Sequence, residues 1–320
     1  MKRYLPYLAG LGIALAWGLS FLFTKGVLDY LSPFHLLGLR FAAAFMAMFI
    51  LRALNLIRIS LSFSDYIRLL PLAIFQPILY FSAETAGIML TSASYAAMMI
   101  ASIPIFVAIL GTVMLNEHPN RMQFLFILAS VAGVVFIIIM DNQAVTTINP
   151  LGTVALLGAV IAAAFYNIFS RKASATYTPL QTTWVMMIVG AILFNLIALT
   201  QNYFSGTISL YLQPLGQIWP SIVYLGVASS VGAFFLFNYL LSKVAASQAS
   251  VFANLITVVA IAAGITFRGE TFTWYHLIGT AAILGGVWGT NHYAAKNSPK
   301  VDQAEFPESD RITTVSGSQS

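Results

Sequence analysis

The sequence predicts an all-α integral membrane protein, with ten transmembrane helices arranged as two inverted repeats of five. Three observations support this fold class. Of the 320 residues, 59% are hydrophobic and only 8% are charged, whereas soluble domains carry about 25% charged residues. Ten apolar runs are each long enough to cross a bilayer, and the second half of the chain repeats residue spacings of the first. This composition excludes a soluble enzyme and a disordered chain.

The ten apolar runs define the predicted helices in order, because about 20 apolar residues are needed to cross the hydrocarbon region. They cover residues 6–24, 34–53, 69–90, 93–115, 122–140, 151–170, 180–200, 218–241, 247–267 and 273–291. The runs are too long for strands and lack alternation. Some connections are very short, which favours antiparallel neighbours. The tail is rich in Ser, Asp, Glu and Thr, and we expect it to be disordered.

Lysine and arginine residues indicate the orientation of the helices. If both termini lie inside, twelve of the fifteen fall on the inner side, Lys25 and Arg268 lie outside, and Arg40 lies within a helix. Basic residues concentrate in cytoplasmic loops. We therefore predict a multi-pass protein of the bacterial inner (plasma) membrane with both termini in the cytoplasm. The net charge of +5 is interpreted as a topology signal and not as a sign of nucleic-acid binding.

An internal repeat relates the two halves of the chain. A shift of 153 places Ala93-Ser94 on Ala246-Ser247, Gly111 on Gly264 and Glu117 on Glu270, and an earlier shift of 146 places Pro33 on Pro179 and Lys25 on Arg171. Five helices are an odd number, so the second copy must enter the membrane in the opposite direction. Transporters with inverted repeats bind solutes near the midplane, between the repeats. The predicted parts are residues 1–145, residues 146–293 and a cytoplasmic tail, 294–320.

Several stretches resemble a known family. They are Ala16-Trp17-Gly18-Leu19-Ser20-Phe21 with Lys25, Pro33 through Arg40-Phe41, and TSASYAAMMIASIPIFVAILGTVMLNE at residues 91–117, followed by a helix with Gly133. Over roughly residues 5–292 the chain is similar to the drug/metabolite transporter superfamily, in particular its EamA family of ten-helix carriers. The resemblance implies a central cavity, alternating access and usually export of amino acids or other metabolites. Thr257 stands where Pro104 predicts a proline, which places strict symmetry of the fourth and ninth helices in doubt.

Arg40 and Glu84 are the most informative ionisable residues, because a charge within a membrane helix needs a partner or a water-filled cavity. Each lies about 9 Å below the outer surface at about 1.5 Å per residue, so their depths allow an ion pair. Glu84 is the candidate for binding a proton or a substrate amine, with Arg40 tuning it or holding a carboxylate. A static ion pair that orders two helices is the alternative. Their repeat equivalents, Met186 and Phe237, are uncharged.

Other deep polar, aromatic and methionine residues are candidates for lining a solute cavity. Together with Glu84 they are Trp17, Ser20, Tyr80, Tyr95, Met98, Ser102, Tyr166, Asn167, Phe234, Asn238 and Asn254. Such groups also bind helices to one another, so packing is the alternative for each. Small residues such as Gly133 and Gly286 predict close packing of the fifth and tenth helices, on each other or across a dimer. Glu117 and Glu270 follow helix ends and are interpreted as loop or cap residues.

We expect a secondary carrier that moves a small, partly apolar metabolite, such as an amino acid, by alternating access. Export is the expected direction, and proton coupling through Glu84 is a further hypothesis. The chain has no cysteine, Walker motif, HExxH motif or histidine ligand spacing, so we expect no cofactor, no metal and no enzymatic activity. The expected partners are the solute and the lipid bilayer, without nucleic acid, for a monomer or homodimer. Uptake by the same fold, or a non-transporting structural subunit, remains an alternative.

Overall fold

The computed structural model describes residues 5–28, 30–90, 96, 99–140, 149–206, 215–268 and 273–294. Within these residues every regular element is helical. Seven helices are long and apolar enough to cross a membrane, and two shorter apolar helices cover Leu5–Ser20 and Ile103–Leu115. The all-helical membrane fold is therefore confirmed, while the total of ten crossings stays a prediction. The predicted tail from residue 295 onward, together with Tyr95, Met98 and Glu270, lies outside the described residues, whereas Ala294 still belongs to the last helix.

The helices of the first half follow the predicted runs closely. They are α1 Leu5–Leu28, α2 Pro33–Ala53, α3 Phe63–Ala73, η1 Ile74–Leu79, α4 Tyr80–Leu90, α6 Ile103–Leu115 and α7 Arg121–Met140. The third begins six residues before its apolar run at 69. The side chain of Ser62 accepts from the backbone N–H of Asp65, whose carboxylate accepts from the N–H of Ser62. Because of this capping box the helix begins in a polar segment, where hydropathy alone does not predict a helix.

The helices of the second half repeat this order. They are α8 Pro150–Ala173, α9 Pro179–Phe204, α10 Leu215–Val223, η3 Tyr224–Gly232, α11 Ala233–Lys243, α12 Ala246–Val251, η4 Phe252–Asn254, α13 Leu255–Arg268 and α14 Trp274–Ala294. Proline occupies the first turn of α2, α6, α8 and α9. There its missing N–H has no intrahelical partner to lose. The local sequence therefore accounts for the start of four helices.

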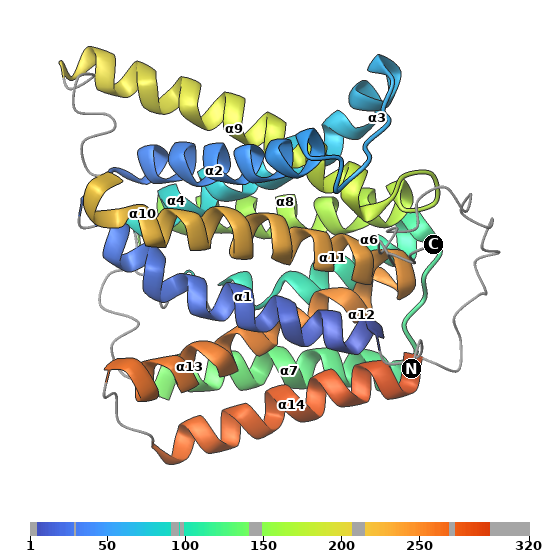
Figure 1. Ribbon diagram of the computed structural model, residues 1–320. Helices are drawn as coiled ribbons and strands as arrows, with labels where there is room; N and C mark the ends of the chain where they lie inside the picture. The colour runs from blue at the N-terminus through green and yellow to red at the C-terminus, as the bar shows by residue number, and fades with distance from the viewer. Residues whose placement is uncertain are drawn as a thin grey trace, which may run out of the picture.

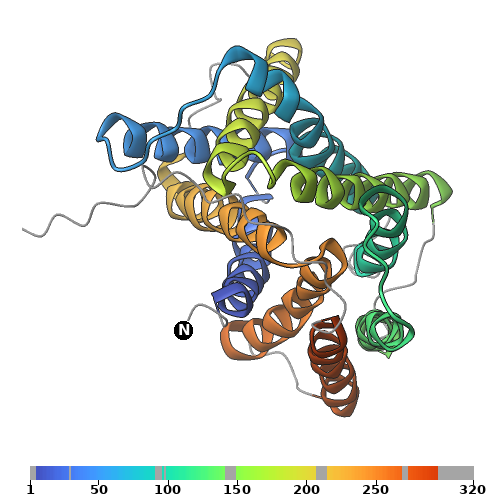
Figure 2. The same ribbon diagram turned by 90° about the vertical axis from the view of Figure 1, so that its right-hand side faces the viewer.

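The helices lie side by side, with their axes running roughly from left to right in Figure 1. α1 begins and α14 ends at the right-hand end of that view, which we call the terminal end (Figure 1). α1 and α8 run in opposite directions, and so do α2 and α9 (Figure 1). Figure 2 looks at the terminal end and shows α7 and α14 together at one edge of the bundle.

Helix contacts between the two repeats occur in equivalent pairs: where two helices pack together, their repeat equivalents also pack together. α2 packs on its repeat equivalent α9, and α7 packs on its equivalent α14. α4 packs on α8, and the exchanged pair of α11 on α1 is also present. Likewise, α6 packs on α8 while α13 packs on α1. Exchanged contacts of this kind belong to a pseudo-two-fold axis, as an inverted repeat requires.

Equivalent helices of the two repeats are irregular at the same depth. A shift of 153 moves η1, Ile74–Leu79, onto residues 227–232, within the π-helical segment η3. The fourth helix turns at Ala101-Ser102 before α6, and the same shift brings this turn to η4 and the start of α13. The missing proline at Thr257 therefore does not remove the interruption of the ninth helix. Discontinuous helices near the midplane are where many transporters bind their solutes.

α7 and α14 pack through glycine faces, which confirms that the fifth and tenth helices contact each other. A Cβ atom at Gly286 would lie 2.5 Å from the Cβ of Ser130 and 2.7 Å from the carbonyl oxygen of Phe126. A Cβ at Gly133 would lie 2.7 Å from the carbonyl oxygen of Gly279. Only glycine allows backbones to approach this closely.

Candidate solute-binding site

Arg40 is buried in α2 and binds the π-helical segment η3. Its Nε donates to Ser230 Oγ at 2.8 Å, and its Nη2 donates to Ser229 Oγ at 3.0 Å. The guanidinium carbon lies 5.1 Å from the centre of the Phe81 ring, a cation–π arrangement. The charge is thus held by two hydroxyl groups of η3 and an aromatic face of α4.

Tyr80 and Glu84 form a hydrogen-bonded pair on α4. The Tyr80 hydroxyl donates to Glu84 Oε1 at 2.9 Å, as residues four apart on one helical face can. On one side of Glu84, Phe81 packs against Phe41 of α2. On the other side, Gly87 faces α8. Glu84 therefore lies on the side of α4 that faces α2 and α8, and both members of the pair keep part of their surface accessible.

The ion pair that the equal depths of Arg40 and Glu84 allowed is not formed. Among the described side chains, no nitrogen of Arg40 comes within 4.0 Å of a Glu84 oxygen, although the two charges interact over a longer distance. The N–H groups of Arg40 donate to the hydroxyl groups of Ser229 and Ser230 in η3, and the carboxylate of Glu84 accepts from the hydroxyl of Tyr80. Depth along a helix does not determine rotation about its axis, so sequence alone could not decide this contact.

Trp17 of α1 joins the same region. Its Nε1 donates to the carbonyl oxygen of Ser229 at 2.9 Å, and its ring lies 5.4 Å from that of Phe234 and 5.5 Å from that of Phe237. Ser20 is buried, and its hydroxyl donates to the carbonyl oxygen of Trp17. The structure therefore brings Trp17, Arg40 and Phe234 together around η3, while Ser20 serves its own helix.

Asn238 of α11 is the centre of a buried polar network that sequence reasoning listed only as separate residues. Its Oδ1 accepts from the Tyr166 hydroxyl at 3.0 Å and from the Ser170 hydroxyl at 2.6 Å. Its Nδ2 donates to Thr183 Oγ1 at 3.0 Å and also contacts the Met186 sulfur. These bonds join α8, α9 and α11. The side-chain amide of Asn238 is therefore fully engaged in contacts with other helices.

Asn167, by contrast, keeps a free acceptor. It is 3% exposed, and its Nδ2 donates to the carbonyl oxygen of Ala163 at 2.8 Å. Its Oδ1 has no hydrogen-bond partner among the described residues. Asn167 lies on α8 between the face of Tyr166, which bonds α11, and the face of Ile168, which lies toward α6. A buried acceptor without a partner is expected to bind a water or ligand donor.

Two further candidates form hydrogen bonds within the protein, one between the two repeats and one within its own turn. Asn254 of η4 donates to Ser130 Oγ of α7 at 3.0 Å. Ser102 donates to the carbonyl oxygen of Met99 at the turn before α6. In the described part of the chain, no group of three or more His, Asp or Glu side chains is placed to hold a metal ion.

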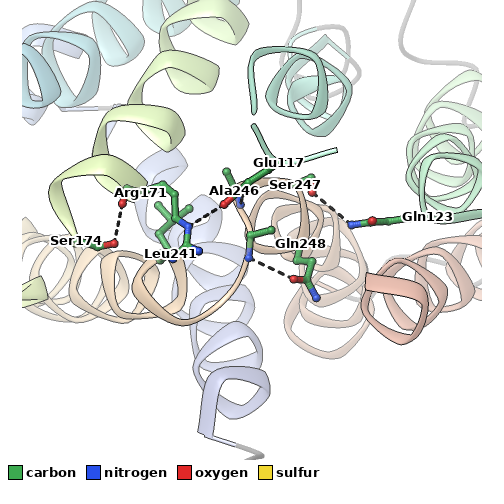
Figure 3. A network of polar contacts seen from close by, with 9 residues as sticks. Glu117, Gln123, Arg171, Ser174, Leu241, Ala246, Ser247 and Gln248 are labelled. Carbon is green, nitrogen blue, oxygen red and sulfur yellow. Dashed lines mark hydrogen bonds and ion pairs between the residues drawn. The ribbon is translucent and has the colours of Figure 1, made fainter. Parts of the chain in front are cut away.

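A charged cluster at the terminal end was missed by the sequence analysis. Glu117, interpreted there as a loop or cap residue, forms an ion pair with Arg171 of α8, with 2.9 Å between Oε1 and Nε (Figure 3). Its Oε2 accepts from the backbone N–H of Ala246 at 2.7 Å, and Arg171 Nη1 donates to the carbonyl oxygen of Leu241 at 3.0 Å. The repeat carried a signal for this pair, because an acid and a base recur at equivalent positions in both halves.

A second contact between the halves lies at the same end. The Tyr177 hydroxyl, in the connection between α8 and α9, donates to Asp65 Oδ1 at 2.9 Å. Desolvation, together with this hydrogen bond to a carboxylate, raises the pKa of the Tyr177 phenol above its ordinary value. The phenol therefore stays protonated and acts as a donor at neutral pH.

Comparison with known proteins gives a consistent result. The profile of the EamA-like transporter family matches residues 5–139 and again residues 150–291. "Uncharacterized transporter YcxC" of Bacillus subtilis (strain 168) is 36% identical over 287 residues, which cover 89% of this chain and 92% of that protein. An uncharacterized transporter of Archaeoglobus fulgidus is 29% identical over 273 residues, covering 85% and 93%. A solved crystal structure with 17% identity superposes with a TM-score of 0.74, over 91% of this chain and 98% of that one.

Proposed function

Because the chain belongs to the EamA-like transporter family, we propose that it carries a small, partly apolar metabolite across the bacterial inner membrane by alternating access, in the direction of export. The observation that carries this proposal is the Tyr80–Glu84 pair, which lies on the side of α4 that faces α2 and α8 and keeps part of its surface accessible. An ionisable group in that position needs water or a ligand beside it. A structural subunit with a solid interior would give Glu84 neither.

The surroundings of Glu84 favour an amine-bearing solute such as an amino acid. Glu84 supplies a carboxylate. Phe81, three residues away on α4, packs against Phe234, and Phe234 packs against Trp17, so this carboxylate lies beside an aromatic cluster. Arg40 already donates to Ser229 and Ser230, so it offers little to a strongly anionic cargo. Protonation of Glu84 would couple solute movement to protons.

The distribution of basic residues supports an orientation with the terminal end in the cytoplasm. In that orientation α4, the helix that carries the partly exposed pair, lies in the half toward the outside, and the buried helix α12 lies in the half toward the cytoplasm. The structure then represents the carrier closed to the cytoplasm.

Cysteine labelling tests whether this pair borders open space. The chain has no native cysteine, so Tyr80→Cys is a single reporter, and Met48→Cys, at a position with 0% exposure in α2, is its matched control. We expect a membrane-impermeant maleimide added outside to label Tyr80→Cys and to leave Met48→Cys unmodified. If the two react equally slowly from both sides of the membrane, the carrier proposal is contradicted.

Transport by proteoliposomes tests the role of Glu84. With phenylalanine as the probe, we expect Glu84→Gln to reduce exchange by about tenfold and to remove its dependence on pH. The loss of one charge-assisted hydrogen bond, about 1.5–3 kcal/mol, is large enough for this change. Ser82→Ala, a partly exposed position on another face of α4, is expected to transport normally. Wild-type exchange by Glu84→Gln with unchanged pH dependence would rule out the coupling role.

A further inference from the structure

The short helix α12 closes the terminal end of the bundle. All six of its residues, Ala246–Val251, are buried. It packs on α6, α8 and α11 as well as on α14. Farther along the same chain segment, every residue from 256 to 261 is partly exposed. The closed part of the interior is therefore the layer that α12 occupies.

The carboxylate of Glu117 fixes the N-terminus of α12 from outside the helix. The Gln248 side chain of α12 accepts the N–H of Ala245 at 3.2 Å. Glu117 Oε2 accepts the next N–H, that of Ala246, at 2.7 Å (Figure 3). A negative charge at this position also interacts favourably with the helix dipole. The first turn of α12 is thus held by a residue of the other repeat.

Arg171 extends this contact to a third helix. It pairs with Glu117 and donates to the carbonyl oxygen of Leu241, in the last turn of α11 (Figure 3). The side chains of Arg171 and Glu117 are only 15% and 14% exposed. The Coulomb attraction between opposite charges is stronger where water is largely excluded than at an open surface. One ion pair therefore holds α8 and the α6–α7 connection to α11 and α12.

These contacts cross between two groups of helices. α4, α6 and α8 pack together through α8, whereas α11 and α13 pack together through α1. Arg171 of α8 and Glu117, which follows α6, lie on the side of the first group, and Leu241 of α11 lies in the second. Ala246 begins α12, which leads along the chain into η4 and α13 of the second group. One turn deeper, Tyr166 and Ser170 of α8 bond Asn238 of α11 and form a second layer across the same boundary.

We propose that Glu117 and Arg171 form a latch that holds α11 and α12 against α6 and α8, and that this latch must break before solute can leave or enter at the terminal end. The inference rests on the proposed carrier function, because only a carrier needs this boundary to open. Glu117 is a positioning residue: it contacts the N-terminus of α12 and reaches the solute path only through that helix.

Two cysteine reporters in the full chain test the latch. Ser250→Cys, at a buried position of α12, reports opening at the terminal end, and Tyr80→Cys reports opening at the opposite end. Each is combined with Glu117→Gln and labelled with impermeant maleimide in vesicles of both orientations. We expect Glu117→Gln to raise labelling of Ser250→Cys about tenfold from the side of the terminal end, which corresponds to about 1.4 kcal/mol. Labelling of Tyr80→Cys from the other side should fall.

Two further variants separate a latch from general loosening. Tyr177→Phe removes the hydrogen bond to Asp65 at the same end without touching α12, and we expect both reporters to keep their wild-type rates. Arg171→Lys keeps the charge opposite Glu117 but not the two-nitrogen geometry, and we expect a smaller shift in the same directions.

The outcomes distinguish this inference from the proposed function. If Glu117→Gln and Arg171→Lys leave both reporters unchanged, or raise both together, the latch is wrong, because the first result shows no gating and the second shows loss of packing. If Tyr80→Cys is unreactive in the chain with Glu117 intact, the carrier proposal fails first. Opposite shifts of the two reporters support the latch.

Discussion

Replacing Gly286 with alanine is expected to lower the free energy of unfolding by about 1–3 kcal/mol, as overpacking does in other cores. The added Cβ would lie 2.5 Å from the Cβ of Ser130, and 2.7 Å from both the nitrogen of Ser130 and the carbonyl oxygen of Phe126. Two of these are backbone atoms of α7 and cannot rotate away. α7 and α14 would have to separate along their shared face. Denaturant titration of the purified protein in detergent measures the change.

The neighbouring glycine provides the control. A Cβ at Gly285 would have no atom within 4 Å, and alanine is favoured over glycine in a helix by about 1 kcal/mol. Gly285→Ala should therefore be neutral or stabilising, although it lies one residue away on the same helix. Equal effects of the two substitutions would mean that the α7–α14 contact is not tight in the membrane protein.

Asn238→Leu is expected to be the most damaging substitution in the polar network of the interior. The hydroxyls of Tyr166 and Ser170 would lose the acceptor that both share. A buried polar group left without a partner costs about 1–3 kcal/mol, so we expect a loss of about 2 kcal/mol or more. The midpoint of thermal unfolding in detergent, compared with that of Tyr166→Phe, measures it. Tyr166→Phe removes only one of the bonds and should cost less.

Removing the whole network should restore part of the stability. Replacing all the partners of a buried hydrogen bond with apolar groups can be nearly neutral. We therefore expect the triple variant Tyr166→Phe, Ser170→Ala and Asn238→Leu to unfold at a higher temperature than Asn238→Leu alone. A different pattern, in which Asn238→Leu keeps full stability but abolishes transport, would place Asn238 in the solute site and not in helix packing.

Hydropathy and the repeat predict most of this fold, because the lengths of apolar runs and the spacing of glycines are set by the bilayer and by helix contact. The start of α3 was placed too late, since its capping box around Ser62 and Asp65 lies outside the apolar run. The kink in η1 lies at Gln76, whose φ of −148° and ψ of 119° are not helical. The following Pro77 is a local sequence signal for this kink, because proline interrupts a helix. The π-helical segment η3 was not predicted, since its wider turns result from tertiary packing and no local residue pattern specifies them.

The contacts within the candidate site could be predicted from the sequence less completely than the fold. The sequence identified Trp17, Arg40, Tyr80 and Glu84 as deep and polar, and the structure brings them to η3 and α4. It could not show which of them bond each other, because that depends on rotation about each helix. Glu117 was underestimated for another reason: its partners come from segments 54 and 129 residues away.

The bond from Trp17 to the main-chain carbonyl of Ser229 has an evolutionary consequence. A carbonyl without a donor is costly in hydrocarbon, so position 17 is constrained by the backbone of another helix, whichever cargo the carrier binds. Descendants of this gene that acquire a new substrate should still carry an N–H or O–H side chain there. Substitutions that accompany a change of substrate are expected at positions whose side chains do not bond the backbone of a neighbouring helix.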